Sequence, residues 1–268
     1  MNVAVVLPIY RNSFTNEESI SLNHFNYFLN DYEVVVIKPI SLNFFFDKIS
    51  PSKVINFPDH YFRSVSDYSK LLLRREFYEA FVKYDYILIY QLDCLIFNDK
   101  LKHFCKLDYD YIGAPIFQRN RTKPIISRVG NGGFSLRRVQ TFLDVLSTQR
   151  YIYKPVSFSK ELFTVNIPDL VEWPIHKRLI KKIRILRAIR IGVEKYTKRY
   201  SLNEDLFWSD RAHLFYPDFK IASIEEGLRF SFDRHPRYCF EKNNQQLPFG
   251  CHAWAKWDRG FWEPYLIT

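Results

Sequence analysis

The chain has 268 residues and a formal net charge of +10, and 47% of its residues are hydrophobic and 18% aromatic. This composition excludes a disordered or fibrous chain and predicts a packed globular protein with one large domain or two small ones. The excess of Lys and Arg favours anionic partners, namely nucleotides, phospholipids or nucleic acid.

Strands and helices are predicted to alternate along the first third of the chain. Residues 3–10 predict a first strand, because they are apolar and end in a polar loop. Thr15 is followed three positions later by Glu18, which predicts a capping box at the start of a helix reaching about residue 30. Residues 32–38 predict a second strand, and residues 67–83 carry apolar side chains at helical spacing.

The segment YDYILIYQLDCLIF, residues 84–97, holds an apolar run that ends in a single carboxylate, Asp93. An uninterrupted apolar run is typical of a strand buried on both faces. A carboxylate at the end of such a strand is costly to bury unless it is paired, hydrogen-bonded or bound to a cation. Because ligands collect at the carboxyl ends of strands in open α/β sheets, Asp93 is a candidate ligand of a divalent cation. The alternative is a strand-end Asp that caps the next turn.

Residues 110–114 predict a short strand, and residues 135–146 predict a helix. The alternation of strands and helices indicates the α/β class, with a Rossmann-type, mostly parallel twisted sheet flanked by helices on both faces. No apolar run reaches 18 residues, so we expect no membrane span. The first residues lack the charged stretch and cleavage site of a signal peptide, and we expect them to form a strand.

Residues 176–200 differ from the rest of the chain, since they contain ten Lys and Arg residues around apolar residues at helical spacing. This pattern predicts an inserted basic amphipathic helix, which is typical of an element on a membrane surface. The alternative is an ordinary helix that packs on the core and exposes a charged face. Contact with nucleic acid is not favoured, because it would leave the motifs described next without a role.

The loop GNGGFSLRR, residues 130–138, contains three of the eight glycines in the chain. Such a loop lets the backbone approach a ligand closely, although a plain tight turn would use the same residues. It has neither the Walker pattern nor the G-x-G-x-x-G spacing. We expect Ser135 to cap the helix that follows.

Acidic and histidine side chains supply the remaining candidates. Glu204 and Asp205 precede an apolar LFW run, where they are either partners of the helix dipole or a general base with its neighbour. His252 is a candidate ligand, although a lone His is more often a satisfied surface or core side chain. The four cysteines form no C-x-x-C pair, so we expect reduced thiols of a cytosolic protein and no zinc site: Cys94, Cys105, Cys239 and Cys251.

The order of these motifs resembles that of GT-A glycosyltransferases: a strand-end Asp, a Gly-rich loop, a Glu-Asp pair before a helix and a late His. The resemblance is closer to a mostly bacterial family of predicted glycosyltransferases. The similar segments are YDYILIYQLD (84–93), DYIGAP (110–115), GNGGFSLR (130–137) and NEDLFW (203–208). They extend over most of the chain, from about residue 60 to about residue 255.

The resemblance implies a role for each matching residue. Asp93 and His252 would hold a divalent cation, Mn²⁺ or Mg²⁺, although Gln91 replaces the first Asp of the usual D-x-D motif. Asp205 would be the base of an inverting reaction, with Glu204 as its neighbour and alternative. The nucleotide would contact Tyr10, Arg11, Gln91 and Asp93. The substrate would contact Gly130, Asn131, Gly132, Gly133, Phe134 and Trp208.

The function implied is transfer of a sugar from a nucleotide-diphosphate-sugar donor to a hydroxyl of a glycan or lipid-linked glycan, in the synthesis of capsule, O-antigen or lipopolysaccharide. We expect one catalytic domain, with residues 1–115 binding the nucleotide-sugar and residues 116–268 forming the acceptor side. The expected location is the cytoplasm, with residues 176–200 on the anionic inner face of the plasma membrane and no nucleic-acid partner. An inactive sugar-binding protein of the same fold and a hydrolase with paired carboxylates stay open as alternatives.

Overall fold

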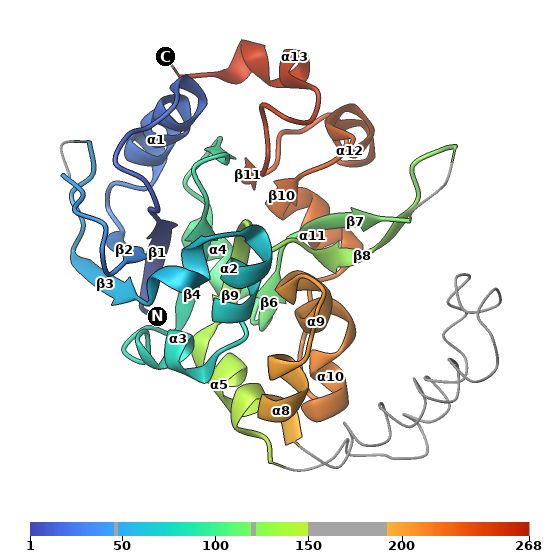
Figure 1. Ribbon diagram of the computed structural model, residues 1–268. Helices are drawn as coiled ribbons and strands as arrows, with labels where there is room; N and C mark the ends of the chain where they lie inside the picture. The colour runs from blue at the N-terminus through green and yellow to red at the C-terminus, as the bar shows by residue number, and fades with distance from the viewer. Residues whose placement is uncertain (46–47, 119–121, 150–191, 268) are drawn as a thin grey trace.

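The computed structural model describes residues 1–45, 48–118, 122–149 and 192–267, and its centre is a six-stranded mixed sheet (Figure 1). Strands β3, β2, β1 and β4 are mutually parallel, and β9 runs antiparallel to β4 and β6. This arrangement confirms the predicted α/β class with a mostly parallel sheet. In spatial order the strands are β3 (Lys53–Phe57), β2 (Glu33–Pro39), β1 (Val3–Pro8), β4 (Tyr86–Tyr90), β9 (Phe134–Arg138) and β6 (Tyr111–Ile112).

Successive side chains of a strand point to opposite faces of a sheet, and in this sheet hydrophobic side chains are buried on both faces. On β1, Ala4 and Val6 belong to one buried cluster, whereas Val5 and Leu7 belong to another. The helices that contribute to the first cluster are α2 (Val65–Leu71), α3 (Arg75–Glu79), α5 (Val139–Ser147), α8 (Gly192–Lys198), α9 (Glu204–Asp210) and α10 (Ala212–Phe215). The second cluster is covered by α1 (Asn16–Phe28) and α4 (Leu101–Lys106).

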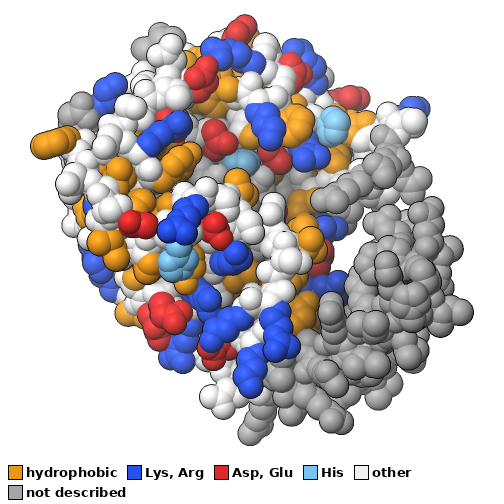
Figure 2. All heavy atoms as spheres, viewed as in Figure 1, with side chains coloured by type: hydrophobic (Ala, Val, Ile, Leu, Met, Phe, Trp, Pro, Cys, Tyr) orange, Lys and Arg blue, Asp and Glu red, His pale blue; other side chains and the backbone are white. Residues whose placement is uncertain are grey.

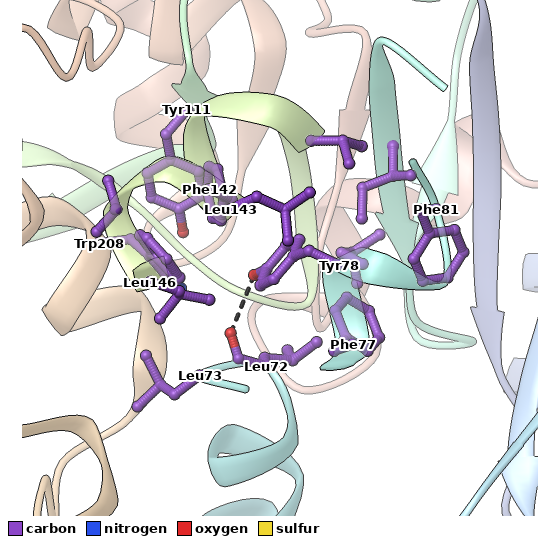
Figure 3. Close-up of a cluster of buried hydrophobic side chains, with 14 of the residues drawn as sticks. Leu72, Leu73, Phe77, Tyr78, Phe81, Tyr111, Phe142, Leu143, Leu146 and Trp208 are labelled. Carbon is purple, nitrogen blue, oxygen red and sulfur yellow. Dashed lines mark hydrogen bonds between the residues drawn. The ribbon is translucent and has the colours of Figure 1, made fainter. Parts of the chain in front are cut away.

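The first cluster is rich in aromatic rings (Figure 3). Tyr78 and Trp208 are fully buried there, and the Trp208 ring lies 4.0 Å from that of Phe142, centroid to centroid. The Tyr78 hydroxyl donates a 3.0 Å hydrogen bond to the Leu72 carbonyl, which satisfies a polar group that the cluster would otherwise bury alone. Phe207 and Trp208 belong to this cluster, so it holds in place α9, the helix that carries the acidic pair.

The fold also contains a second, three-stranded sheet. Strands β10 (Ser231–Phe232) and β11 (Gly250–Cys251) are parallel, and β5 (Leu95–Ile96) runs antiparallel to β11. A separate hairpin joins β7 (Ala114–Phe117) to β8 (Ile126–Gly130). The remaining elements are η1 (Asp59–Phe62), α11 (Ile224–Phe230), α12 (Pro236–Lys242), α13 (Arg259–Trp262) and η3 (Glu263–Tyr265).

The local predictions were confirmed in part. The capping box is present, since the Thr15 and Glu18 side chains each accept a hydrogen bond from the other's backbone N–H. The single helix predicted over residues 67–83 is wrong: the chain forms two short helices, α2 and α3, with extended backbone at Arg74. The helix predicted over residues 135–146 is confirmed from Val139 onward as α5, but its start is wrong, because residues 134–138 pair with β4.

Most of the predicted basic helix, residues 176–191, lies outside the described residues. Its last part is α8, where Val193 is fully buried and Lys198 pairs with Glu194. Within the described ranges, none of the helices combines the length and the apolarity that crossing a bilayer requires. All four cysteines are buried and free, as expected.

Candidate active site

Asp93 lies three residues beyond the end of β4, in a turn closed by a 3.0 Å hydrogen bond from the Cys94 N–H to the Gln91 carbonyl. All five residues of β4 are buried, as predicted from the apolar run. The Asp93 side chain itself is 48% exposed, so it is not the buried carboxylate that its position suggested. Because water still reaches the carboxylate, Asp93 does not carry the desolvation cost of a buried charge.

His252 lies between two carboxylates. Its Nε2 atom is 3.4 Å from Asp93 Oδ1, and its Nδ1 atom is 3.3 Å from Asp233 Oδ1. The amide oxygen of Gln91 is also 3.3 Å from Nε2. The structure thus brings the predicted residues Gln91, Asp93 and His252 together. It adds Asp233, which the sequence analysis missed although it follows an apolar FSF segment much as Asp93 follows its strand.

The two carboxylates determine the charge of the imidazole. Burial alone would lower the pKa of His252, but Asp93 and Asp233 outweigh it and raise this pKa to about 9. The ring is therefore positively charged at neutral pH, and its charge offsets part of the negative charge of Asp93 and Asp233.

A divalent cation would have a partial set of ligands here. Within the described part of the chain, no group of three or more His, Cys, Asp or Glu side chains is arranged to hold a metal. Asp93 and His252 provide one oxygen and one nitrogen donor, and the Gln91 amide adds an uncharged oxygen. Mg²⁺ commonly takes one or two carboxylates from the protein and its other ligands from phosphates and water. These residues therefore fit a cation shared with a bound diphosphate, and not a metal site built wholly from protein.

A cavity of about 490 Å³ adjoins Asp93 and brings together all four residues predicted to contact the nucleotide: Tyr10, Arg11, Gln91 and Asp93. Its volume is in the range of small-molecule sites. Further lining comes from Phe62, Arg63, Ser64 and Val65, between η1 and α2, which the sequence analysis did not single out.

The two arginines in this cavity differ in their partners. Arg11 pairs with Glu18, whose carboxylate also accepts the Thr15 N–H of the capping box at 2.8 Å. Arg63 forms no ion pair with any residue that the structure describes. Its charge is therefore available to an anionic ligand in the cavity.

The Gly-rich loop is held by Asn131, which has a φ of 83°, a conformation that Asn tolerates better than most residues. The Asn131 Oδ1 atom accepts hydrogen bonds from the backbone N–H groups of Gly133, at 3.0 Å, and Phe134, at 3.3 Å. Because the oxygen is used in this way, the Nδ2 atom faces His252 Nδ1, 3.1 Å away. Asn131 thus places the loop beside the imidazole, whose Nδ1–H in the charged ring is directed to Asp233.

Two glycines of the loop allow close packing against site residues. A Cβ at Gly132 would lie 2.0 Å from Glu204 Oε1, and one at Gly133 would lie 2.1 Å from His252 Nε2. The loop therefore does approach other groups closely, as its composition suggested. The nearest groups to these two glycines are the side chains of Glu204 and His252.

Glu204 and Asp205 begin α9, as predicted, but their environments differ. The Glu204 side chain is 6% exposed and pairs with the buried Arg137, with Nη2 and Oε1 3.0 Å apart. Ser69 donates a further 3.1 Å hydrogen bond to Glu204 Oε2. With both oxygens engaged, Glu204 has a structural role, and its predicted alternative role as a base is withdrawn.

Asp205 is partly exposed, and its Oδ1 atom accepts only the N–H of the next residue, Leu206, at 2.9 Å. Burial, followed by the charge of Glu204, raises the pKa of Asp205 to about 6. Asp205 also contributes to the raised pKa of His252, so the two side chains lie within electrostatic reach of each other. Asp205 is therefore a carboxyl group whose charge changes near neutral pH.

Phe134 and Trp208 were predicted to contact the substrate, and the structure corrects this. Both are 0% exposed: Trp208 packs in the cluster of Figure 3, and Phe134 packs against Phe230, with ring centroids 5.1 Å apart. Aromatic residues next to a functional motif can equally serve the core, and sequence spacing does not separate the two roles.

The fold, a mixed α/β architecture with a mostly parallel central sheet, matches that of GT-A glycosyltransferases. The solved structure of an active-site mutant of LgtC has a TM-score of 0.50 at 12% sequence identity, and the similarity covers 99% of this chain and 96% of that one. A model of the family described as "Protein of unknown function (DUF5672)" matches residues 51–252, and the chain belongs to this family.

Two further solved structures have lower TM-scores. Apo-form GlyE from Streptococcus pneumoniae TIGR4 has a TM-score of 0.44 at 12% identity; the similarity covers 99% of this chain but only 60% of the GlyE chain. A glycosyltransferase for the major capsid of PBCV-1 has a TM-score of 0.41 at 8% identity, with 94% and 92% of the two chains covered. A search of curated proteins gives no match.

Proposed function

We propose that this protein is a glycosyltransferase that moves a sugar from a nucleotide-diphosphate-sugar to a hydroxyl of a glycan or lipid-linked glycan. The observation that carries the proposal is the cavity of about 490 Å³ that contains Tyr10 and Arg11 and ends at Asp93. Asp93 contacts His252, and His252 lies within electrostatic reach of Asp205. The residues proposed for the donor, the cation and the base are thus near one another, which supports the proposal.

The donor is proposed to occupy the cavity with its base near Tyr10 and Phe62 and its diphosphate near Arg11 and Arg63. Tyr10 is 54% exposed and lies beside Arg11, whose guanidinium is 5.5 Å from the Tyr10 ring centroid. Aromatic rings suit a planar base, and guanidinium groups suit phosphate oxygens. The excess positive charge of the chain favours the same class of ligand.

Asp93 and His252 would hold a divalent cation, Mn²⁺ or Mg²⁺, together with the diphosphate. The cation, when bound, would stabilise the negative charge that develops on the leaving nucleoside diphosphate. Gln91 adds an oxygen without charge, so the affinity of the empty site for the cation should be low and should rise when the diphosphate binds.

Asp205 is proposed as the base. The bond between the sugar C1 and the phosphate oxygen breaks, a bond forms between C1 and the acceptor oxygen, and the hydroxyl proton passes to the Asp205 carboxylate. A pKa of about 6 leaves this carboxylate ionised at neutral pH but more basic than an ordinary Asp. A base that acts directly on the acceptor hydroxyl implies inversion at C1.

Donor turnover by Asp205→Asn tests the proposal, with Asp210→Asn as the matched control. Asp210 lies on the same helix and pairs with Arg128, 2.9 Å away. Loss of a general base lowers turnover by about 10²–10⁴-fold, whereas the control should stay close to wild type. A nucleotide-sugar panel with and without Mn²⁺ would identify the donor. Asp205→Asn turnover close to that of the wild-type protein would remove Asp205 from the chemistry.

One observation favours a second candidate function, an inactive sugar-binding protein of the same fold. Gln91 stands where a carboxylate is expected, and no metal-holding group of three side chains occurs among the described residues. Such a protein would bind a nucleotide-sugar, with a rise in melting temperature, but would release neither sugar nor nucleotide.

The setting proposed for the reaction is cell-surface polysaccharide synthesis at the inner face of the plasma membrane. It depends on the basic segment 176–200, of which residues 176–191 lie outside the described part of the chain. Flotation with liposomes of anionic and neutral lipid at low salt tests the membrane contact. Equal recovery with both lipids would remove the membrane from the proposal.

A further inference from the structure

Two loops leave the same edge of the small sheet. Strands β10 and β11 are parallel and in register, with Phe232 opposite Cys251, so Asp233 and His252 emerge side by side. Leu95 of β5 lies opposite Cys251 on the other side, which places Asp93 at the same level. The residues that follow in these loops, Arg234 and those up to residue 257, therefore lie next to the Asp93–His252–Asp233 group. On the face shown in Figure 2, acidic, basic and histidine side chains gather close together near the middle.

Hydrogen bonds tie the second loop to the candidate active site. The Trp254 N–H donates to the Asp93 carbonyl at 3.2 Å, and the N–H groups of Lys256 and Trp257 both donate to the Ala253 carbonyl, at 3.0 and 3.1 Å. Ala253 has a φ of 53°, which turns the chain sharply just after His252. The position of Trp257 is thus fixed relative to Asp93.

Two cations meet at the Trp257 ring. The Arg234 guanidinium carbon is 4.7 Å from the ring centroid, and the Lys256 ammonium nitrogen is 5.1 Å from it. Both side chains are exposed, and neither forms an ion pair with a residue of the described ranges. Neighbouring arginines do have partners: Arg237 pairs with Asp258 at 2.7 Å, and Arg259 with Glu17 at 2.9 Å. Because neither cation is held in an ion pair, both charges are available to an anionic ligand at the ring.

Trp257 is also unusual among the described tryptophans. Trp208, Trp254 and Trp262 are all 0% exposed, whereas Trp257 is partly exposed. The accessible part of the Trp257 indole provides apolar surface that a sugar ring can contact. The ring and the two cations together offer contacts for a sugar and for an acidic group on it.

We infer that Arg234, Lys256 and Trp257 form an acceptor subsite that binds a glycan carrying a phosphate or a carboxylate group. The inference rests on the proposed function, since it assigns this surface to the acceptor of the same reaction. The proposed donor diphosphate has its own cations, Arg11 and Arg63, in a cavity whose lining includes Asp93 but none of these three residues.

Binding of small sugars tests the inference. The probes are glucose 6-phosphate, glucuronate and neutral glucose, titrated against tryptophan fluorescence with and without a saturating nucleoside diphosphate. We expect the wild-type protein to bind at least one anionic sugar more tightly than glucose. The double variant Arg234→Gln/Lys256→Gln should weaken that binding about tenfold or more, because charge-assisted hydrogen bonds are lost. Comparing the affinities for glucose 6-phosphate and glucuronate shows whether the subsite prefers a phosphate or a carboxylate.

Arg237→Gln is the matched control, because it removes a nearby exposed arginine that already has a carboxylate partner. Equal affinity for glucose and its anions, equal weakening in the control, or no anion binding by the wild-type protein would overturn the inference. Nucleoside diphosphate binding and donor turnover, measured on the same preparations, report on the proposed function separately. If the protein turns over its donor but fails these sugar tests, the inferred acceptor subsite is wrong and the proposed function is unaffected.

Discussion

Arg137 and Glu204 form a buried ion pair that joins the central sheet to the helix carrying the candidate base. Their side chains are 0% and 6% exposed, and Nη2 of Arg137 is 3.0 Å from Oε1 of Glu204. The same guanidinium donates to the Tyr78 hydroxyl at 2.8 Å, the Ser135 hydroxyl at 3.0 Å and the Gly132 carbonyl at 3.3 Å. One side chain on β9 thus fixes the Gly-rich loop and the start of α9 relative to each other.

Glu204→Ala should destabilise the protein strongly, since it leaves the Arg137 charge buried without its partner. Breaking a buried pair from one side costs about 3–5 kcal/mol of unfolding free energy. Glu204→Gln is the control, because the amide keeps a hydrogen-bond acceptor for Arg137 and should cost less. Urea unfolding followed by circular dichroism measures both. A Glu204→Ala variant within about 1 kcal/mol of wild type would show that the pair is not a structural tie.

The acidic pair also predicts a pH dependence of stability. The pKa of Asp205 rises from its ordinary 3.8 to about 6 in the folded protein, so the folded state holds a proton that the unfolded state has already lost. The contribution of Asp205 to the unfolding free energy is therefore greatest below pH 4, falls by on the order of 2–3 kcal/mol as the pH rises toward 6, and is level above that.

Asp205→Asn isolates this contribution, because it removes the titrating carboxyl. The difference in unfolding free energy between wild type and variant should change between pH 4 and pH 6 and be constant above that. Urea unfolding at a series of pH values measures it. A difference that does not vary with pH would mean that Asp205 titrates like an ordinary Asp.

The central strands and the acidic pair were predictable because their signals are local. The run YILIY is apolar enough to indicate β4 without any partner, and the Thr15–Glu18 spacing is a complete capping motif by itself. Residues 135–138 were assigned to the start of the helix predicted over residues 135–146. Pairing with Tyr86–Tyr90, about 50 residues away in the chain, overrides that local preference.

The site could be predicted only in part for the same reason. Gly132 and Gly133 stand out in the sequence, but their neighbours Glu204 and His252 come from distant segments. Arg63 gave no signal, because it lies in an irregular stretch between η1 and α2 with neither helical nor strand periodicity. Burial decides between a substrate contact and a core residue at Trp208, and sequence spacing does not report burial.

Arg63→Gln should weaken nucleoside diphosphate binding about 10–100-fold, since a charge-assisted contact to phosphate contributes about 1.5–3 kcal/mol. Binding of the bare nucleoside should change little, because the base is proposed to lie against aromatic rings. Arg75→Gln is the control, as Arg75 is exposed and already paired with Glu79, 2.8 Å away. Isothermal titration calorimetry with both ligands separates the effects. Equal loss for nucleoside and diphosphate would assign Arg63 to cavity shape and not to phosphate.

Gly133→Ala should disturb the site more than the fold. The new Cβ would lie 2.1 Å from His252 Nε2 and 2.7 Å from Gln91 Oε1, so the imidazole has to move from its present position beside Asp93. We expect a loss of about 1–3 kcal/mol in stability from overpacking. We also expect the Mn²⁺-dependent part of nucleoside diphosphate binding to be lost, because the distance between the proposed cation ligands, Asp93 and His252, changes.

Gly260→Ala provides the comparison for that experiment, since a Cβ there meets no atom within 4 Å. It lies in α13, where Ala is the better helix former, so its stability should be unchanged or slightly raised. Thermal shift with nucleoside diphosphate, with Mn²⁺ and with chelator, measures fold and cation dependence together. If Gly133→Ala keeps the full Mn²⁺-dependent shift, His252 can move without loss of the cation, and the placement of the cation between Asp93 and His252 is wrong.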